Sequence, residues 1–125
     1  MEGSKTDQIE ERLIEFSISV IKLAQCLPRT PPCRHISVQI LRSSTGSASN
    51  YAEARGAESR ADFIHKLGIA LKELREARCW LAMTIRCELL PSARLNELTK
   101  ESDELVRILA KSVATARKGP ASNRR

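Results

Sequence analysis

Basic side chains gather in the middle of the sequence, where they could contact phosphate groups. If residues 59–89 form one helix, Lys72, Arg75 and Arg86 fall within about 60° of one another, because each residue of an α-helix turns the chain by about 100°. Four further basic residues cluster around the same region: Arg42, Arg55, Arg60 and Lys66. Repeated around a symmetric oligomer, these seven cations would form a positive band, and we predict that they bind the phosphates of RNA or DNA.

The alternative for the same residues is a solvated helix face whose charges pair, as Lys72 and Glu76 could at a spacing of four. Aromatic residues make up only 3% of the chain, so few are available for base stacking and any readout would be nonspecific. Trp80, the single tryptophan, is predicted to anchor a protein interface rather than to stack on a base.

The charge balance agrees with an acidic partner without requiring one. The formal net charge is +6 and the pI is about 9.5. A count along the chain gives −1 for residues 1–33 (4 basic, 5 acidic), +3 for residues 34–90 (9 and 6) and +4 for residues 91–125 (8 and 4). The positive charge therefore belongs to the later two-thirds, where nucleic-acid contact and simple solubility both explain it.

Residue types that carry out catalysis do not combine into a recognisable site. The sequence has no phosphate-binding loop, Rossmann glycine pattern, His-Glu-x-x-His or Gly-x-Ser-x-Gly. His65 stands among polar neighbours, and nothing near it in sequence would orient it as a base. Glu73 and Glu76 lie three apart, but di-iron bundles need Glu-x-x-His pairs from facing helices. We therefore expect no enzyme activity and no cofactor.

The cysteines are expected to be free thiols. Cys26, Cys33, Cys79 and Cys87 lack the two-residue spacing of a zinc knuckle, and the two histidines do not complete a ligand set. The N-terminal residues begin no signal peptide, and no apolar run approaches the roughly 20 residues needed to span a membrane. The expectation is a cytoplasmic protein with no metal and no membrane contact.

Apolar spacing predicts the first helix over residues 7–27. Its core row recurs at intervals of three and four: Ile9, Leu13, Phe16, Val20, Leu23 and Leu27. Asp7 is expected to cap the start, and Pro28 to open a rigid connector that ends at Arg34. A second row, Ile14, Ile18 and Ile21, lies roughly 100–140° around the helix. We interpret this row as a subunit interface, with a wide core within the chain as the alternative.

Three more helices are expected, over about residues 35–54, 59–89 and 92–117. Ser59 begins the third with a capping-box-like start, and Ser92 is the expected N-cap of the fourth. The third helix carries a second apolar row, from which Ile69, Trp80 and Met83 are assigned to the interface. These elements predict an all-α, antiparallel up-down-up-down four-helix bundle over residues 1–118, with a basic, disordered tail at 119–125.

Small residues fill the stretch from Ser43 to Asn50, which could form a loop, a phosphate-binding site or a helix. We predict that it continues the second helix, with small side chains that let neighbouring helices approach closely. Gly46 would cost about 1 kcal/mol of helix propensity relative to alanine, which close packing could offset. The turn is expected later, at Gly56 before Ser59.

The segment SVQILRSSTGSASNYAEARGAESRADFIHKLGIALKELREARCWLAM resembles the four-helix-bundle family of proteins encoded by intervening sequences in bacterial large-subunit ribosomal RNA genes. The resemblance covers roughly residues 9–115. The positions that match the family pattern are Gln39, Ile40, Arg42, Ser43, Asn50, Glu53, Ser59, Phe63, Leu67, Ile69, Ala70, Glu76 and Leu81. From this pattern we expect Asn50, Glu53 and Glu76 to be structural polar groups, buried or bridging helices.

The resemblance implies a homopentamer of four-helix bundles that forms a barrel with a basic surface. The fold is also similar to the accessory variability proteins of diversity-generating retroelements, which bind a reverse transcriptase and its RNA. The sequence departs from the commoner pattern where Lys72-Glu73 replaces a Gly-Ser pair and where Ala54-Arg55 follows Glu53. We therefore expect a non-enzymatic oligomeric adaptor for RNA or DNA, with a reverse transcriptase as a candidate partner. The alternative is a structural or protein-binding oligomer without nucleic-acid contact.

Overall fold

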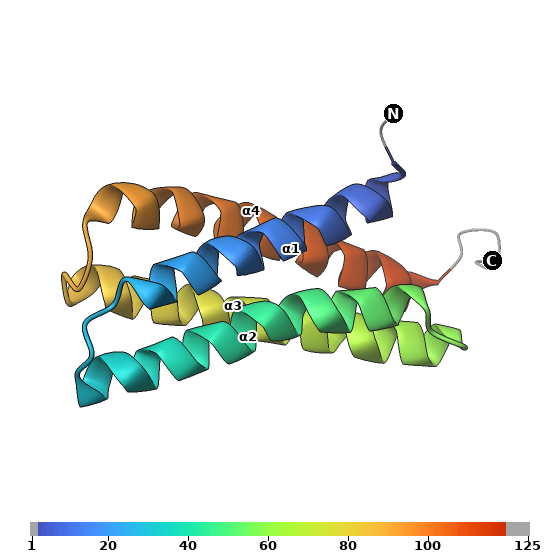
Figure 1. The fold of residues 1–125 in the computed structure, drawn as a ribbon. Coiled ribbons are helices and arrows are strands. Elements are labelled where there is room, and N and C mark those ends of the chain that lie inside the picture. Colours follow the sequence, from blue (N-terminus) through green and yellow to red (C-terminus); the bar gives the residue numbers. More distant parts are fainter. Residues whose placement is uncertain (1–2, 120–125) are drawn as a thin grey trace.

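The fold is a bundle of four antiparallel helices. The computed structural model describes residues 3–119, which form α1 (Lys5–Gln25), α2 (Pro31–Arg55), α3 (Arg60–Arg86) and α4 (Ser92–Lys118). Successive helices run in opposite directions, and the described residues include no strand (Figure 1). The predicted all-α fold with four helices is confirmed. Residues 120–125 of the predicted tail lie outside the described residues.

Helix α1 begins two residues before the predicted start, because Ser4 rather than Asp7 is the N-cap. The hydroxyl of Ser4 accepts a hydrogen bond from Asp7 N at 3.1 Å, and the Asp7 carboxylate accepts one from Ser4 N at 3.1 Å. This reciprocal capping box satisfies two backbone N–H groups that have no partner inside the helix. The helix ends at Gln25, two residues earlier than predicted.

Helix α2 begins at Pro31, so the predicted connector up to Arg34 is too long. Thr30 is the N-cap and accepts a hydrogen bond from Cys33 N at 3.4 Å. Prolines at the first two helical positions are compatible with this start, because N–H groups in the first turn have no intrahelical acceptor. The small-residue stretch 43–50 lies within α2, which confirms its prediction as helix.

The remaining helix ends differ from prediction by a few residues. Ser59 caps α3 by accepting a hydrogen bond from Asp62 N at 3.0 Å, as predicted. The helix ends at Arg86, three residues before the predicted end, and Glu88 then takes a left-handed backbone conformation with φ of 54°. Ser92 is already the first residue of α4, and Pro91 precedes it without a side-chain cap. Helix α4 ends at Lys118, and its C-cap residue Gly119 has a φ of 82°, which suits glycine.

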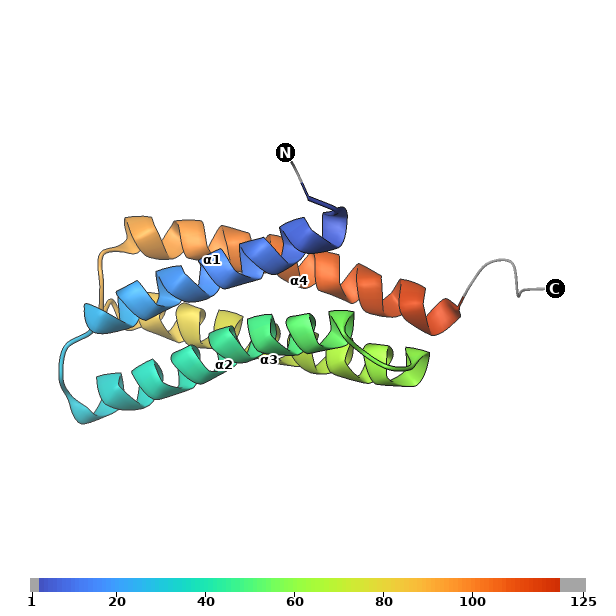
Figure 2. The ribbon, with the colours of Figure 1, turned by 45° about the vertical axis from the view of Figure 1, so that its right-hand side comes forward.

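An aliphatic core runs along the bundle. All six residues of the predicted α1 row are buried, and α3 buries Leu67, Leu74 and Leu81 opposite Leu95, Leu105 and Leu109 of α4. Helices α2 and α3 run side by side, whereas α1 and α4 cross and diverge toward the chain termini (Figure 1 and Figure 2). Within residues 3–119, no helix is both long and apolar enough to cross a membrane.

Candidate nucleic-acid interface

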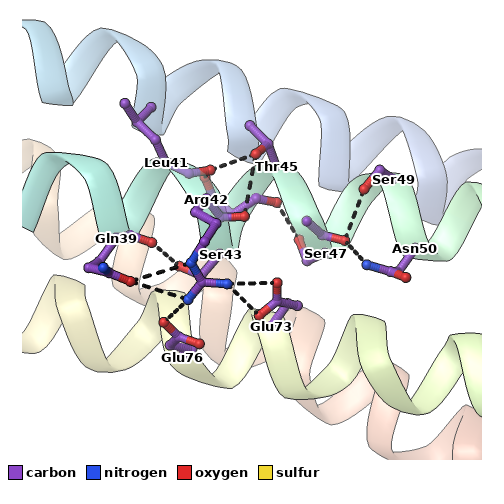
Figure 3. A network of polar contacts seen from close by, with 12 residues as sticks. Gln39, Leu41, Arg42, Ser43, Thr45, Ser47, Ser49, Asn50, Glu73 and Glu76 are labelled. Atoms are coloured by element: carbon purple, nitrogen blue, oxygen red, sulfur yellow. Dashed lines mark hydrogen bonds and ion pairs between the residues drawn. The ribbon is translucent and has the colours of Figure 1, made fainter.

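Arg42, one of the seven predicted phosphate contacts, is held by carboxylates of the neighbouring helix. Its guanidinium donates to Glu73 Oε1 at 3.2 Å and Oε2 at 3.1 Å, and it also donates to Glu76 (Figure 3). Gln39 Oε1 accepts a further bond at 3.3 Å. The hydrogen bond from Arg42 lowers the pKa of the Glu76 carboxyl, and the indole N–H of Trp80, 3.2 Å from Glu76 Oε2, adds to this effect. Arg42 therefore ties α2 to α3.

Three more of the predicted cations also have acceptors within the chain. Arg55 pairs with Asp7 at 2.5 Å and with Glu10 at 2.7 Å, and its hydrogen bond lowers the pKa of Asp7. Lys66 pairs with Glu53 at 2.7 Å, and Arg60 donates to the carbonyl oxygen of Ala116. Contact with a phosphate would compete with these bonds, although nothing in the fold forbids it.

The other three predicted cations have no such partners. Lys72, Arg75 and Arg86 lie exposed along the outer side of α3, and within residues 3–119 none of them forms an ion pair. The Lys72–Glu76 pair of the alternative interpretation does not form, and Glu76 pairs with Arg42 instead. Whether any of the seven residues contacts a nucleic acid stays a prediction.

Helix α4 supplies a row of cations that the sequence reasoning missed. Lys100, Arg107, Lys111 and Lys118 are all exposed. Their spacings of 7, 4 and 7 place them within about 40° of one another and spread them over about 27 Å at 1.5 Å per residue. They lie on the side of α4 opposite its buried leucines. These helical spacings are visible in the sequence, so the row of cations could have been predicted from it.

The cations of α3 and α4 share one side of the bundle. Arg78 of α3 pairs with Asp103 of α4 at 3.5 Å, so in this antiparallel pair Arg75 comes level with the segment that holds Arg107. Arg117 and Lys72 line one hollow between the two helices. We call the following set the basic face: Lys72, Arg75, Arg86, Lys100, Arg107, Lys111, Arg117 and Lys118. All eight are exposed, and in the described part of the chain none forms an ion pair.

The apolar residues assigned to an oligomer interface fall into two groups. Ile14, Ile18 and Ile21 are 38–40% exposed on α1, and Val38 of α2, which the prediction missed, is 60% exposed. The hydrogen bond from Ser17 Oγ to Ser44 O at 3.0 Å joins α1 to α2. We call the four exposed apolar residues of these two helices the apolar face. Figure 1 looks onto α1 and α2, with α3 and α4 behind them. The apolar face thus belongs to α1 and α2, and the basic face belongs to the other two helices, α3 and α4.

The second predicted interface group lies on α3. Met83 is 40% exposed, whereas Ile69 and Trp80 are half-buried. The Trp80 ring meets the His35 ring edge-on at 5.6 Å, and its N–H is bonded to Glu76. Much of the Trp80 side chain is thus used inside the chain, and its role in an interface stays a prediction.

The three predicted structural polar groups behave differently from one another. Glu76 and Glu53 bridge α2 and α3 through Arg42 and Lys66, as expected, although Glu53 is exposed. Asn50 is half-buried and donates to Gly46 O at 2.8 Å within α2, so it bridges no helices. Sequence alone could not separate these cases, because an amide four residues after a carbonyl can always bond within its own helix.

Other groups that could take part in chemistry are dispersed. Cys33 is buried, and Cys26, Cys79 and Cys87 are exposed free thiols. Among residues 3–119, no three His, Cys, Asp or Glu side chains lie close enough together to hold a metal ion. The surface charge is therefore the feature of this chain that most clearly suits a ligand.

Comparison with known proteins gives two findings. The sequence pattern of a family described as 23S rRNA-intervening sequence protein matches residues 5–111. A crystal structure of a protein with unknown function from the S23 ribosomal protein family of Bacteroides thetaiotaomicron is similar, with 34% sequence identity and a TM-score of 0.81. The similarity covers 89% of this chain and 99% of that one. A search of curated proteins gives no significant match.

Proposed function

This chain belongs to the 23S rRNA-intervening sequence protein family, and on that premise we propose that it is a non-enzymatic, homo-oligomeric adaptor that binds the phosphate backbone of RNA or DNA. One observation carries the proposal. The eight cations of the basic face are exposed on α3 and α4, and in the described part of the chain none of them forms an ion pair. Such a surface attracts a polyanion, because binding releases the counterions condensed on the phosphates.

The side chains around the basic face favour contact with phosphates over reading of bases. Phe16 and Tyr51 are buried, and Phe63 and Trp80 are half-buried, so the described residues offer no exposed Phe, Tyr or Trp ring for stacking. Rows of arginine and lysine on a convex helical surface instead contact the sugar-phosphate backbone of a nucleic acid. The proposed binding is therefore sequence-independent and strongly dependent on salt.

The apolar face supports the oligomeric part of the proposal. Three isoleucines and a valine exposed together on α1 and α2 are unusual for a monomer, and they fit a contact between copies. Because this face belongs to α1 and α2 and the basic face to α3 and α4, association through it would leave the cations accessible. Several copies would then contact one nucleic acid at once and raise its apparent affinity. A pentamer is the assembly that the family resemblance predicts.

Binding of a short fluorescein-labelled RNA duplex at increasing salt tests the proposal. We expect binding that weakens steeply with salt, and a large loss in the variant Lys100→Glu/Arg107→Glu/Lys111→Glu. The matched control, Lys22→Glu/Arg29→Glu/Arg34→Glu, makes the same change in net charge at exposed residues away from the basic face. No binding by the wild type at low salt would rule out the proposed function, and equal losses in both variants would rule out the basic face as the site.

A second candidate is a structural or protein-binding oligomer. It is favoured by the ion pairs of Arg42, Arg55 and Lys66, which give these cations a role inside the fold. This candidate predicts that reversing the basic face changes neither assembly nor capture of a protein partner. A reverse transcriptase as that partner remains a prediction from the family resemblance, and co-purification of the two proteins after co-expression would test it.

A further inference from the structure

Gly68 lies in the middle of α3, yet nothing in the fold requires a glycine there. A Cβ atom built on Gly68 would meet no atom within 4 Å, whereas one on Gly46 would stand 2.6 Å from Glu73 Oε2. Glycine inside a helix is less favourable than alanine, because it loses more backbone freedom on folding. Packing within this chain therefore explains Gly46 but leaves Gly68 unexplained.

Gly68 lines a shallow hollow of about 440 Å³ between α3 and the end of α4. Its other lining residues are Ala61, Ile64, His65, Ile69, Lys72 and Arg117. The lining contains two exposed cations and no carboxylate, so the chemistry of the hollow favours an anion. The isoleucines add apolar surface beside the cations.

We propose that one phosphate of a bound nucleic-acid strand sits over Gly68, between Lys72 and Arg117, with the adjoining sugar against Ile64 and Ile69. A glycine in the contact surface lets the strand approach the helix backbone more closely than any other residue would. Arginine and lysine are the side chains that bind phosphate oxygens through charge-assisted hydrogen bonds. The inference rests on the proposed function and names the position on the basic face where the contact is closest.

Charge argues for a nucleic acid over a second copy of the chain as the occupant. A second copy would carry the same excess of cations, and the hollow offers no carboxylate to receive them. The apolar face, which suits association, is on α1 and α2, whereas the hollow is formed by α3 and α4. A contact between copies at the hollow is one of the outcomes that the following experiment separates.

The test compares wild type with Gly68→Ala and Gly68→Leu, using anisotropy of a fluorescein-labelled RNA duplex, thermal unfolding and light scattering. Ala93→Leu is the matched control, because Ala93 is an exposed residue at the far end of α4 from the hollow. We expect Gly68→Leu to bind roughly tenfold more weakly, the loss of one charge-assisted contact, and to reduce the salt slope by about one. Gly68→Ala should show a smaller loss together with a higher melting temperature, and the control should bind as wild type does.

The outcomes separate this inference from the proposed function. If wild type binds and both Gly68 variants bind equally well, the inference is wrong and the proposed function stands. If wild type does not bind at low salt, the proposed function fails and the inference with it. A lower mass for Gly68→Leu, with unchanged binding per protomer, would make the hollow a contact between copies and overturn the inference. Should the leucine variant not fold, the alanine variant still decides.

A double-mutant cycle tests whether Gly68 and Lys72 serve the same phosphate. If they do, Lys72→Ala should cost much less affinity in the Gly68→Leu background than in the wild type, because the phosphate is already displaced. Independent losses that add would show that Lys72 contacts the RNA elsewhere, and this would contradict the proposed position. Lys111→Ala, outside the hollow lining, is the control and should cost the same in both backgrounds.

Discussion

The carboxylate of Glu73 lies directly against Gly46, so close that a Cβ atom on residue 46 would stand 2.6 Å from Glu73 Oε2. The same carboxylate accepts hydrogen bonds from Arg42, one turn before Gly46 on α2. Gly46 therefore makes room for an ion pair between two helices. This relationship gives the small-residue stretch of α2 a physical role: it forms a closely packed seam rather than a ligand loop.

Replacing the two mid-helix glycines with alanine should have different effects on stability. Gly68→Ala meets no steric obstacle and should raise the free energy of unfolding by about 0.5–1 kcal/mol through helix propensity. Gly46→Ala gains a similar amount but displaces Glu73, so we expect little net change. Urea denaturation of both variants measures the difference. Equal stabilisation would mean that Glu73 moves aside at no cost.

The apolar face should control assembly. Introducing a charge at Ile18, which is 38% exposed, would place a carboxylate in the contact between copies, where it would be desolvated without a partner. We expect Ile18→Glu and Val38→Glu to give smaller particles in light scattering while helical content by circular dichroism stays constant. Gln8→Glu makes the same change in net charge at an exposed α1 residue at least 80° around the helix from the three isoleucines, and it should keep the wild-type mass. An unchanged mass for Ile18→Glu would contradict the interface assignment.

Acid should weaken the bundle through its ion pairs between helices. Arg55 lowers the pKa of Asp7 below its ordinary value of 3.8, and Arg42 lowers that of Glu76 below 4.5. A carboxyl whose pKa is lower in the folded state stabilises the fold above its unfolded pKa, and this contribution is lost as pH falls through the folded pKa. Thermal unfolding should therefore show stability declining below about pH 4. The difference between wild type and Glu76→Gln should shrink over the same range; a constant difference would contradict this account.

Arg12 should hold the crossing helices α1 and α4 together. Its guanidinium donates to both oxygens of Glu101, at 2.7 and 3.0 Å, and to Glu104 at 2.9 Å. A bidentate ion pair such as Arg12–Glu101, in which both side chains are about one-third exposed, is stronger than an average surface ion pair. We expect a coupling energy of about 1 kcal/mol in a double-mutant cycle of Arg12→Ala and Glu101→Ala. A coupling near zero would show that apolar packing alone joins the two helices.

The sequence was most informative about features that depend on a single helix, although the predicted N-caps Asp7 and Ser92 were wrong. The spacing of the α1 core row and the cap at Ser59 depend on a single helix, and both were predicted correctly. The partners of Arg42 and Arg55 were not predictable, because they lie 31 to 48 residues away in sequence and depend on how the helices pack. The cation row of α4 also depends on a single helix. Its spacing of 7, 4 and 7 residues is visible in the sequence, but the predicted phosphate contacts included only cations between Arg42 and Arg86.

The seven cations predicted from sequence should divide into two classes when tested for binding. Arg75→Glu/Arg86→Glu removes two unpaired cations, so RNA affinity should fall and the salt slope should decrease by about two. Arg42→Glu/Arg55→Glu makes the same change in net charge but breaks ion pairs with Glu73, Glu76, Asp7 and Glu10, so its main effect should be a lower melting temperature. Fluorescence anisotropy and thermal unfolding of both variants distinguish the two effects. If the Arg42/Arg55 variant lost as much of the salt slope, the ion pairs within the chain would not decide which cations meet the phosphates, and long-range charge would be the controlling factor.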